Sequence, residues 1–186
     1  MNTVIMGCGR VGARLAALFD RTGHHVTVLD LQPAAFARLP TDYRGSTRLG
    51  TGIDEDVLRA AGIESADLFL AVTNSDNANI MAAQIAKLTF RVPRVVVRIY
   101  DPDREDTFHQ MGLETICPTT LIANRIYESV AHGGEVHLAA ITPAPAPVVP
   151  PTPATPAAPG LGRGDGSEVD PRSGHLTHTL RQRFFR

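Results

Sequence analysis

Residues 3–16 read Thr3-Val4-Ile5-Met6-Gly7-Cys8-Gly9-Arg10-Val11-Gly12-Ala13-Arg14-Leu15-Ala16 and decide the fold of this chain. An apolar run leads into a glycine-rich turn, and helix-forming Ala, Leu and Arg residues follow. This strand–turn–helix context is the one in which three glycines at this spacing bind phosphates. The missing side chains at Gly7 and Gly9 let the backbone approach a pyrophosphate, and Gly12 lets the helix pack closely on the strand. The stretch therefore predicts a nucleotide-binding site.

A second strand, His25–Asp30, ends in a carboxylate about twenty residues beyond the glycines. An acidic side chain at this position accepts hydrogen bonds from both ribose hydroxyls of an adenosine group. The next residues, Leu31-Gln32-Pro33, include no arginine for a 2′-phosphate, so NAD(H) or an adenine nucleotide is favoured over NADP(H). The alternative is that Asp30 caps a helix that begins at Pro33.

Strands and helices are expected to alternate along residues 1–131. Strands are expected at residues 4–6, 25–30, 44–49, 66–72, 95–97 and 114–117, and helices at residues 10–21, 33–39, 54–61, 77–89, 102–111 and 119–130. This alternation predicts an α/β fold of the Rossmann type, a doubly wound parallel six-stranded sheet with right-handed crossovers and helices on both faces. Helical spacing predicts that the apolar residues facing the sheet include Val11, Leu15, Leu18, Phe19, Ile80, Met81, Ile85 and Leu88.

Small polar residues, Thr73-Asn74-Ser75-Asp76-Asn77, follow the buried strand at 66–72. Ligands of doubly wound sheets bind in the crevice at the carboxyl ends of the central strands. We therefore expect Thr73 and Asn74 to line this crevice, while other residues of the run cap the helix that follows.

Two further groups of residues could carry chemistry. The acidic triplet Asp54-Glu55-Asp56 could suggest a divalent metal, but carboxylates at a helix start usually complement the helix dipole, and no metal site is predicted. Cys8 and Cys117 lack the spacing of a metal or disulfide framework, which fits a reduced, cytosolic chain. Cys8 precedes a helix start, where a thiolate is favoured. A redox role for Cys8 is therefore the alternative to a small loop residue.

The overall charge gives no support for some classes of partner, although a local basic patch remains an alternative. The chain carries 18 Lys and Arg residues against 19 Asp and Glu residues, a net charge of −1. Such a balance gives no global field for nucleic acid or an anionic membrane, and no nucleic-acid partner is expected. The first strand begins too early to leave room for a signal peptide, and prolines interrupt the apolar residues near the end. We therefore expect a cytoplasmic protein.

Five blocks of the sequence occur together in the order and spacing of a known family: GCGRVG, GHHVTVLD, GTGIDEDVLRAAGI, ADLFLAVTNSDNANI and RIYDPDREDTFHQMG. Residues 1–131 resemble the N-terminal domain of the TrkA/RCK family, the cytosolic nucleotide-sensing subunits of bacterial Trk/Ktr potassium transporters and of some potassium channels. The resemblance is especially close to the short actinobacterial-type TrkA paralogues.

The resemblance implies a Rossmann-like domain that binds NAD(H) or ATP/ADP. By position, residues 7–12 would cradle the phosphates, Asp30 would hold the ribose and Thr51 would border the adenine. Arg10 stands where the family places an arginine that reaches terminal phosphates, and Arg98 would face the same crevice. The expected nucleotide-contacting residues are Gly7, Cys8, Gly9, Arg10, Val11, Gly12, Asp30, Leu31, Thr51, Gly52, Thr73, Asn74 and Arg98. No catalytic residue and no metal ligand are expected.

The resemblance also implies partners. The chain would form a homo- or hetero-oligomer with other TrkA/RCK subunits and would act on a TrkH/KtrB-like membrane potassium transporter. It would then lie at the inner face of the cell membrane, held there through the transporter. A change of bound nucleotide would alter the conformation that the subunits apply to the pore.

The sequence departs from the family pattern in three places. Thr51 stands where many relatives carry an acid. Pro118-Thr119 stands where some ATP-binding relatives have Pro-Glu, which removes a candidate carboxylate for a cation. The second, C-terminal RCK domain of full-length relatives is expected to be absent. Its place is taken by a Pro/Ala/Gly-rich linker at 132–174 and a basic, aromatic tail at 175–186.

The proline-rich composition of the linker cannot bury a core, so a disordered, extended spacer is predicted. The basic tail could dock on the transporter, on anionic lipid or on nucleic acid, although chain ends are usually disordered.

Two classes of function are compatible with the glycine loop. The first is a nucleotide-controlled regulatory subunit of a potassium uptake system, which is not an enzyme. The alternative is a small NAD-dependent oxidoreductase, but residues beyond 131 lack the composition of a substrate domain. Neither Tyr100 nor Tyr127 is followed by the lysine of a Tyr-x-x-x-Lys pair. A DNA-binding redox sensor is disfavoured because no helix-turn-helix segment is recognisable.

Overall fold

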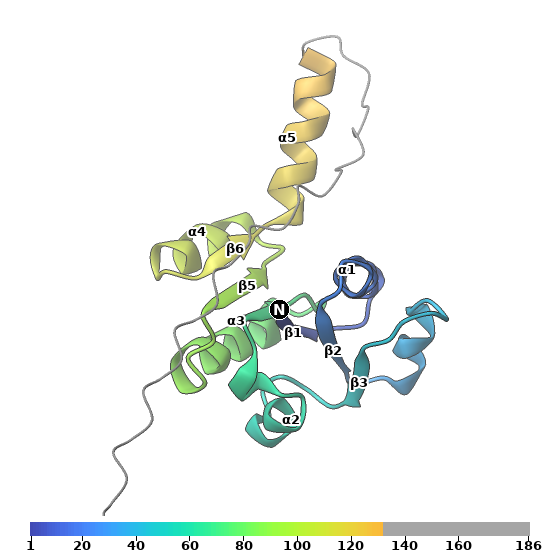
Figure 1. Cartoon of the computed structure of the whole chain (residues 1–186). Helices are drawn as coiled ribbons and strands as arrows, with labels where there is room; N and C mark the ends of the chain where they lie inside the picture. The colour runs from blue at the N-terminus through green and yellow to red at the C-terminus, as the bar shows by residue number, and fades with distance from the viewer. Residues whose placement is uncertain (132–186) are drawn as a thin grey trace, which may run out of the picture. The chain divides into compact units, whose positions relative to one another are not determined.

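Parallel strands form a six-stranded sheet in the order β3-β2-β1-β4-β5-β6 (Figure 1). The computed structural model describes residues 1–131. The strands are β1 (Asn2–Met6), β2 (His25–Asp30), β3 (Ser46–Leu49), β4 (Leu68–Ala71), β5 (Arg94–Arg98) and β6 (Glu114–Ile116). Every neighbouring pair is parallel, and the strand order reverses between β1 and β4. This is the Rossmann order, so the predicted sheet is confirmed.

Helices of three kinds connect these strands. The α-helices are α1 (Arg10–Arg21), α2 (Glu55–Ala60), α3 (Asp76–Gln84), α4 (Pro102–Gln110) and α5 (Pro118–Ala131). The 3-10 helices are η1 (Pro33–Arg38) and η2 (Ile63–Ser65), and the π-helix η3 (Ile85–Thr89) continues α3. The helix predicted at 33–39 is therefore a 3-10 helix, and the helix predicted at 77–89 widens in its last turn.

The central strand β1 contributes to one apolar layer on each face of the sheet. Ile5 packs in a cluster with Ala16 of α1 and Ala35 of η1. Val4 packs in a second cluster with Leu58 of α2 and Ile80 of α3. Alternate residues of a strand point to opposite faces, and both faces are covered as the sequence predicts.

The sheet-facing side of α1 differs from the prediction. Val11 and Leu18 are 43% and 39% exposed, so the expectation that they face the sheet is wrong. The buried residues of this helix include Gly12, Ala13 and Ala16. Small residues let the helix axis lie close to the strands, and the larger side chains then point to the side or outward. Leu15 and Phe19 do pack against the core as partly buried residues.

The continuous helix α3–η3 shows a similar difference. Ile80 is buried and Ile85 packs against the core, as predicted. Met81 and Leu88, however, are 50% and 72% exposed, so their predicted packing is wrong. The π-helical turn changes the residue spacing on which the prediction for Leu88 relied.

The helix α5 exists close to the predicted range, but none of its residues is buried. Its large apolar side chains are all more than half exposed: Leu121, Ile122, Ile126, Tyr127 and Val130. The predicted linker at 132–174 and tail at 175–186 lie outside the described residues. Of the helices that the structure describes, none combines the length and apolar character needed to cross a bilayer.

Candidate functional site

The glycine loop lies at the carboxyl end of β1, where the strand order reverses. Gly7 has a φ of 107°, which favours glycine, and its amide donates to the Leu29 carbonyl at 2.7 Å. A Cβ on Gly12 would lie 1.8 Å from the Gly7 carbonyl oxygen, whereas a Cβ on Gly9 would meet no atom within 4 Å. Gly9 is the N-cap of α1 and supplies no side-chain cap. The first amides of α1 are therefore available to an anion.

Asp30 fixes this loop from the end of β2. Its Oδ2 accepts from the Cys8 amide at 2.7 Å, and its Oδ1 accepts from the Gln32 amide at 2.8 Å. An ionised carboxylate offers about four lone-pair sites, so the side chain keeps acceptor capacity for a ligand. The alternative role of Asp30 as a helix cap is wrong, because Gln32 is the N-cap of η1.

The loop after β3 meets the same edge of the sheet. The carbonyl of Asp30 accepts from the Gly50 amide at 2.9 Å. The buried Gly52 amide lies 3.1 Å from the sulfur of Met6, the last residue of β1. Thr51 lies between these two glycines, and Leu31, which is 65% exposed, directly follows Asp30. The predicted residues Leu31, Thr51 and Gly52 are therefore close to Asp30.

A buried amide side chain, Asn79 of α3, joins the ends of β4 and β5. Its Oδ1 accepts from the Thr73 amide at 2.9 Å and from the Thr73 hydroxyl at 2.6 Å. Its Nδ2 donates to the carbonyls of Thr73 at 3.0 Å and Arg98 at 2.9 Å. Sequence reasoning missed Asn79. The available signal was a polar residue directly before Ile80, on the side of the helix that faces the sheet.

The Asn79 side chain clamps the backbones of Thr73 and Arg98 together, and the guanidinium of Arg98 contacts Thr73. Its Nη2 donates to the Thr73 carbonyl at 2.5 Å, and its central carbon lies 4.6 Å from the centre of the Tyr100 ring. Its Nε is buried and has no hydrogen-bond partner within residues 1–131. An unsatisfied buried donor costs about 1–3 kcal/mol, so a ligand oxygen beside Nε would be stabilised. A Cβ on Gly7 would lie 3.0 Å from the Thr73 amide nitrogen, which shows that this clamp borders the glycine loop.

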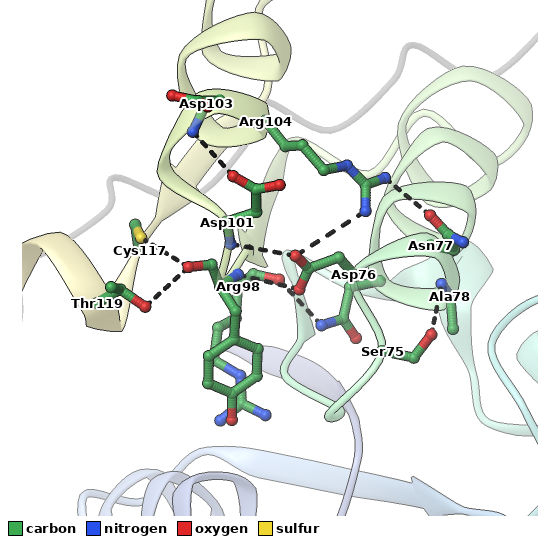
Figure 2. Close-up of polar contacts among 12 residues, drawn as sticks. Ser75, Asp76, Asn77, Ala78, Arg98, Asp101, Asp103, Arg104, Cys117 and Thr119 are labelled. Carbon is green, nitrogen blue, oxygen red and sulfur yellow. Dashed lines mark hydrogen bonds and ion pairs between the residues drawn. The ribbon is translucent and has the colours of Figure 1, made fainter.

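Around the loop that follows Arg98, a polar network joins the starts of α3, α4 and α5 (Figure 2). Asp76 accepts from the amides of Tyr100 at 3.0 Å and Asp101 at 3.3 Å. The Tyr100 carbonyl accepts from the Thr119 hydroxyl at 2.8 Å and from the Cys117 thiol at 3.4 Å. Sequence reasoning placed Asp76 in the polar run but missed the loop that it holds.

The structure thus gathers most of the predicted residues at one edge of the sheet. Gly7, Cys8, Gly12, Asp30, Thr73 and Arg98 are linked by the contacts above. Three predicted residues, Arg10, Val11 and Asn74, are exposed on the adjoining loops and at the first turn of α1. Their side chains make no contact that assigns them to the site.

Two surface hollows lie at the opposite edge, at the amino ends of the strands. One, of about 180 Å³, is bordered by Arg94 and Glu114, and the other, of about 190 Å³, by Asn2 and His25. Neither includes the glycine loop. We place the candidate site at the carboxyl edge because the glycine loop, the fixed carboxylate and the unsatisfied donor meet there.

The acidic triplet and Cys8 have structural explanations. Asp54 caps α2 by accepting from the amides of Asp56 and Val57. Burial raises the pKa of the Cys8 thiol, and the negative charge of Asp30 raises it further. The expectation that the helix start favours a Cys8 thiolate is therefore wrong. No cluster of three or more His, Cys, Asp or Glu side chains that could hold a metal ion occurs in the described part of the chain.

Comparison with known proteins agrees with this architecture. The family model described as "TrkA-N domain" matches residues 3–118, more than half of the chain. The Trk system potassium uptake protein TrkA of Streptomyces coelicolor is 42% identical over 134 residues, which are 72% of this chain and 60% of that protein. The chain thus spans about three fifths of the length of this curated relative.

Solved structures show the same fold. The Kef C-terminal domain of Shewanella denitrificans in its AMP-bound form has a TM-score of 0.62 and 21% identity, over 73% of this chain and 83% of that chain. The GsuK channel bound to NAD has a TM-score of 0.60 and 24% identity, over 71% of this chain and 23% of that chain. With the family match over residues 3–118, the conclusion is that this chain belongs to the TrkA-N domain family.

Proposed function

We propose that this chain is a regulatory subunit of a Trk/Ktr-type potassium transport system that binds NAD(H) or ATP/ADP and changes conformation with the nucleotide bound. The observation that carries the proposal is the meeting, at one sheet edge, of an open glycine loop, a fixed carboxylate and an arginine with an unsatisfied donor. These are the groups that phosphate and adenosine ribose require.

Each part of a nucleotide has a candidate partner among these residues. Asp30 would accept from the ribose hydroxyls, with Leu31 and Thr51 beside the base. The amides of residues 7–12 would donate to the phosphates. Arg98, together with the exposed Arg10, would neutralise terminal phosphate charge. Thr73, Asn74 and Gly52 would line the crevice around them.

Support for an adenine nucleotide also comes from structural relatives. The two solved structures named above are described as bound to AMP and to NAD. We propose the same chemical class of ligand for this chain, because it shares their fold and places the glycine loop, Asp30 and Arg98 at one edge of its own sheet.

The proposal treats the nucleotide as a signal, and we propose no catalytic role. A ligand shifts a conformational equilibrium only when it binds the two conformations with different affinity. ATP and ADP differ in the number of phosphates that Arg98 and Arg10 would face, whereas NAD and NADH differ in the charge of the nicotinamide ring. Such a difference is sufficient in principle for one nucleotide to favour one subunit arrangement.

We propose that α5 contacts another TrkA/RCK subunit in a homo- or hetero-oligomer. The side chains of Ile122, Ile126 and Val130 recur every four residues along the helix and are 60%, 55% and 80% exposed. Contiguous exposed apolar surface marks protein interfaces. The assembled subunits would act on a TrkH/KtrB-like transporter from the cytoplasmic face of the membrane.

Two measurements test the proposal together. Calorimetric titration of the purified full chain with NADH, NAD, ATP and ADP should identify a ligand. Co-purification with a co-expressed TrkH-like membrane protein should recover a complex. Binding without a complex would reject the transporter partner alone, whereas absence of binding to all four nucleotides would reject the proposal.

A further inference from the structure

We propose that the Tyr100 carbonyl couples the nucleotide crevice to α5, so that the position of the Arg98 side chain controls how firmly the first turn of α5 is held. This inference rests on the proposed nucleotide function of the same edge. It adds the route by which nucleotide binding would affect α5, the helix that we propose contacts another subunit.

The crevice side of this route is the contact between Arg98 and Tyr100. The guanidinium lies 4.6 Å from the centre of the Tyr100 ring, and its Nη2 donates to the Thr73 carbonyl. Arg98 is therefore held by two neutral groups, a carbonyl and an aromatic face. A phosphate oxygen is a stronger acceptor for a guanidinium than either, because both partners are then charged.

The unsatisfied Nε of Arg98 favours such a change of partner. In the described residues it is buried without a hydrogen bond. An anion that accepts from Nε would remove the cost of this buried donor. The proposal therefore has two states. In the first, the Arg98 guanidinium contacts the Thr73 carbonyl and the Tyr100 ring. In the second, the guanidinium has moved toward the anion.

The other side of the route is the contact between Tyr100 and α5. The Tyr100 carbonyl accepts from the Thr119 hydroxyl at 2.8 Å and from the Cys117 thiol at 3.4 Å. Figure 2 shows both side chains directed at this one acceptor. No residue of α5 is buried, and these contacts lie at its N-terminal end.

Residues 99–101 connect the Arg98 contact to the Thr119 contact. Hydrogen bonds hold this loop in place, so it can transmit a displacement. Asp76 accepts from the amides of Tyr100 and Asp101, and the Ile99 amide donates to the Ile116 carbonyl at 3.0 Å. The guanidinium of Arg98, by contrast, contacts Tyr100 through its ring. Withdrawal of the guanidinium would leave this ring without its cationic partner and would loosen the Tyr100–Thr119 contact.

Hydrogen–deuterium exchange of the full chain tests this route. With a saturating nucleotide, amides of residues 119–124 should exchange faster than in the free protein, by about fivefold, which is the effect of one ordinary hydrogen bond. Thr119→Val should keep the nucleotide affinity within about twofold but abolish this ligand-dependent change. The matched control, Thr120→Val, leaves the Tyr100 contact intact and should behave as wild type.

Variants of Tyr100 test the contact between its ring and the Arg98 guanidinium. Tyr100→Leu removes the aromatic face and should remove the ligand-dependent change, whereas Tyr100→Phe keeps the face and should retain it. Unchanged or slower exchange in nucleotide-bound wild type, or a full response in Thr119→Val, would overturn the coupling while leaving nucleotide binding in place. Absence of binding in the titration would instead reject the proposed function, and the coupling with it.

Discussion

Two glycines of the same loop, Gly9 and Gly12, have different roles at the level of single atoms. Gly12 is required by the fold, because a Cβ there would collide with the Gly7 carbonyl oxygen. Gly9 has an ordinary φ of −75° and open space where a Cβ would lie. We propose that its lack of a side chain lets a phosphate approach the backbone here.

Alanine at each position separates these roles. Gly12→Ala should lower the free energy of unfolding by at least about 3 kcal/mol, since backbone atoms must move. Gly9→Ala should change it by no more than about 0.5 kcal/mol yet weaken nucleotide binding at least tenfold, roughly the loss of one charged hydrogen bond. Urea unfolding and calorimetry measure the two effects. Normal affinity in Gly9→Ala would argue against phosphate binding at this loop.

Asp30 offers a second test at this scale. Asp30→Asn removes the charge and one acceptor, and affinity for an adenosine nucleotide should fall by about 10- to 100-fold. Asp67→Asn is the matched control, because the Asp67 carboxylate also accepts a backbone amide, that of Asn2, but at the opposite edge of the sheet. Equal losses in both variants would show a general effect of the substitution rather than a ribose contact.

At the scale of elements, Asn79 connects α3 to the ends of β4 and β5. Asn79→Ala should lower the free energy of unfolding by about 2–4 kcal/mol, because the part-buried Thr73 amide and Arg98 carbonyl lose their Asn79 partner. Asn77→Ala, on the same helix, removes an exposed acceptor of Arg104 and should cost no more than about 0.5 kcal/mol. Urea unfolding measures both free energies. A similarly small loss of stability in the two variants would contradict the role of Asn79 in holding the ends of β4 and β5 together.

The central strands could be predicted because parallel, buried strands read as apolar runs at regular intervals. It was harder to predict which face of each helix is buried. Val11 and Leu18 have helical spacing, but the close approach permitted by Gly12 gives the sheet-facing side to Ala13 and Ala16. A hydrophobic pattern alone does not tell which of two adjacent stripes, one of small and one of large residues, is the buried one.

The candidate site shows the same limit. Asp30 and the glycines follow from local sequence, because one loop and one strand end define them. Asn79 and the Tyr100 carbonyl could not be found in this way. Their roles depend on contacts between residues distant in sequence, such as Asn79 with Arg98 and Tyr100 with Thr119.

At the scale of the whole molecule, the exposed apolar side of α5 predicts self-association or association with a related subunit. Ile126→Glu should raise the dissociation constant of the oligomer at least tenfold, because burial of one Ile side chain contributes about 1.5–3 kcal/mol. Asn124→Glu places the same charge on the same helix and should leave it unchanged. Analytical ultracentrifugation measures both. A wild-type chain that stays monomeric alone and with a related subunit would contradict the interface.

The most direct test of the central claim is calorimetric titration of the folded 186-residue chain with NADH, NAD, ATP and ADP. At least one of them should bind with a dissociation constant below about 100 µM, and Asp30→Ala should weaken that binding. Failure of all four to bind a protein shown to be folded would contradict the claim that this sheet edge is a nucleotide site.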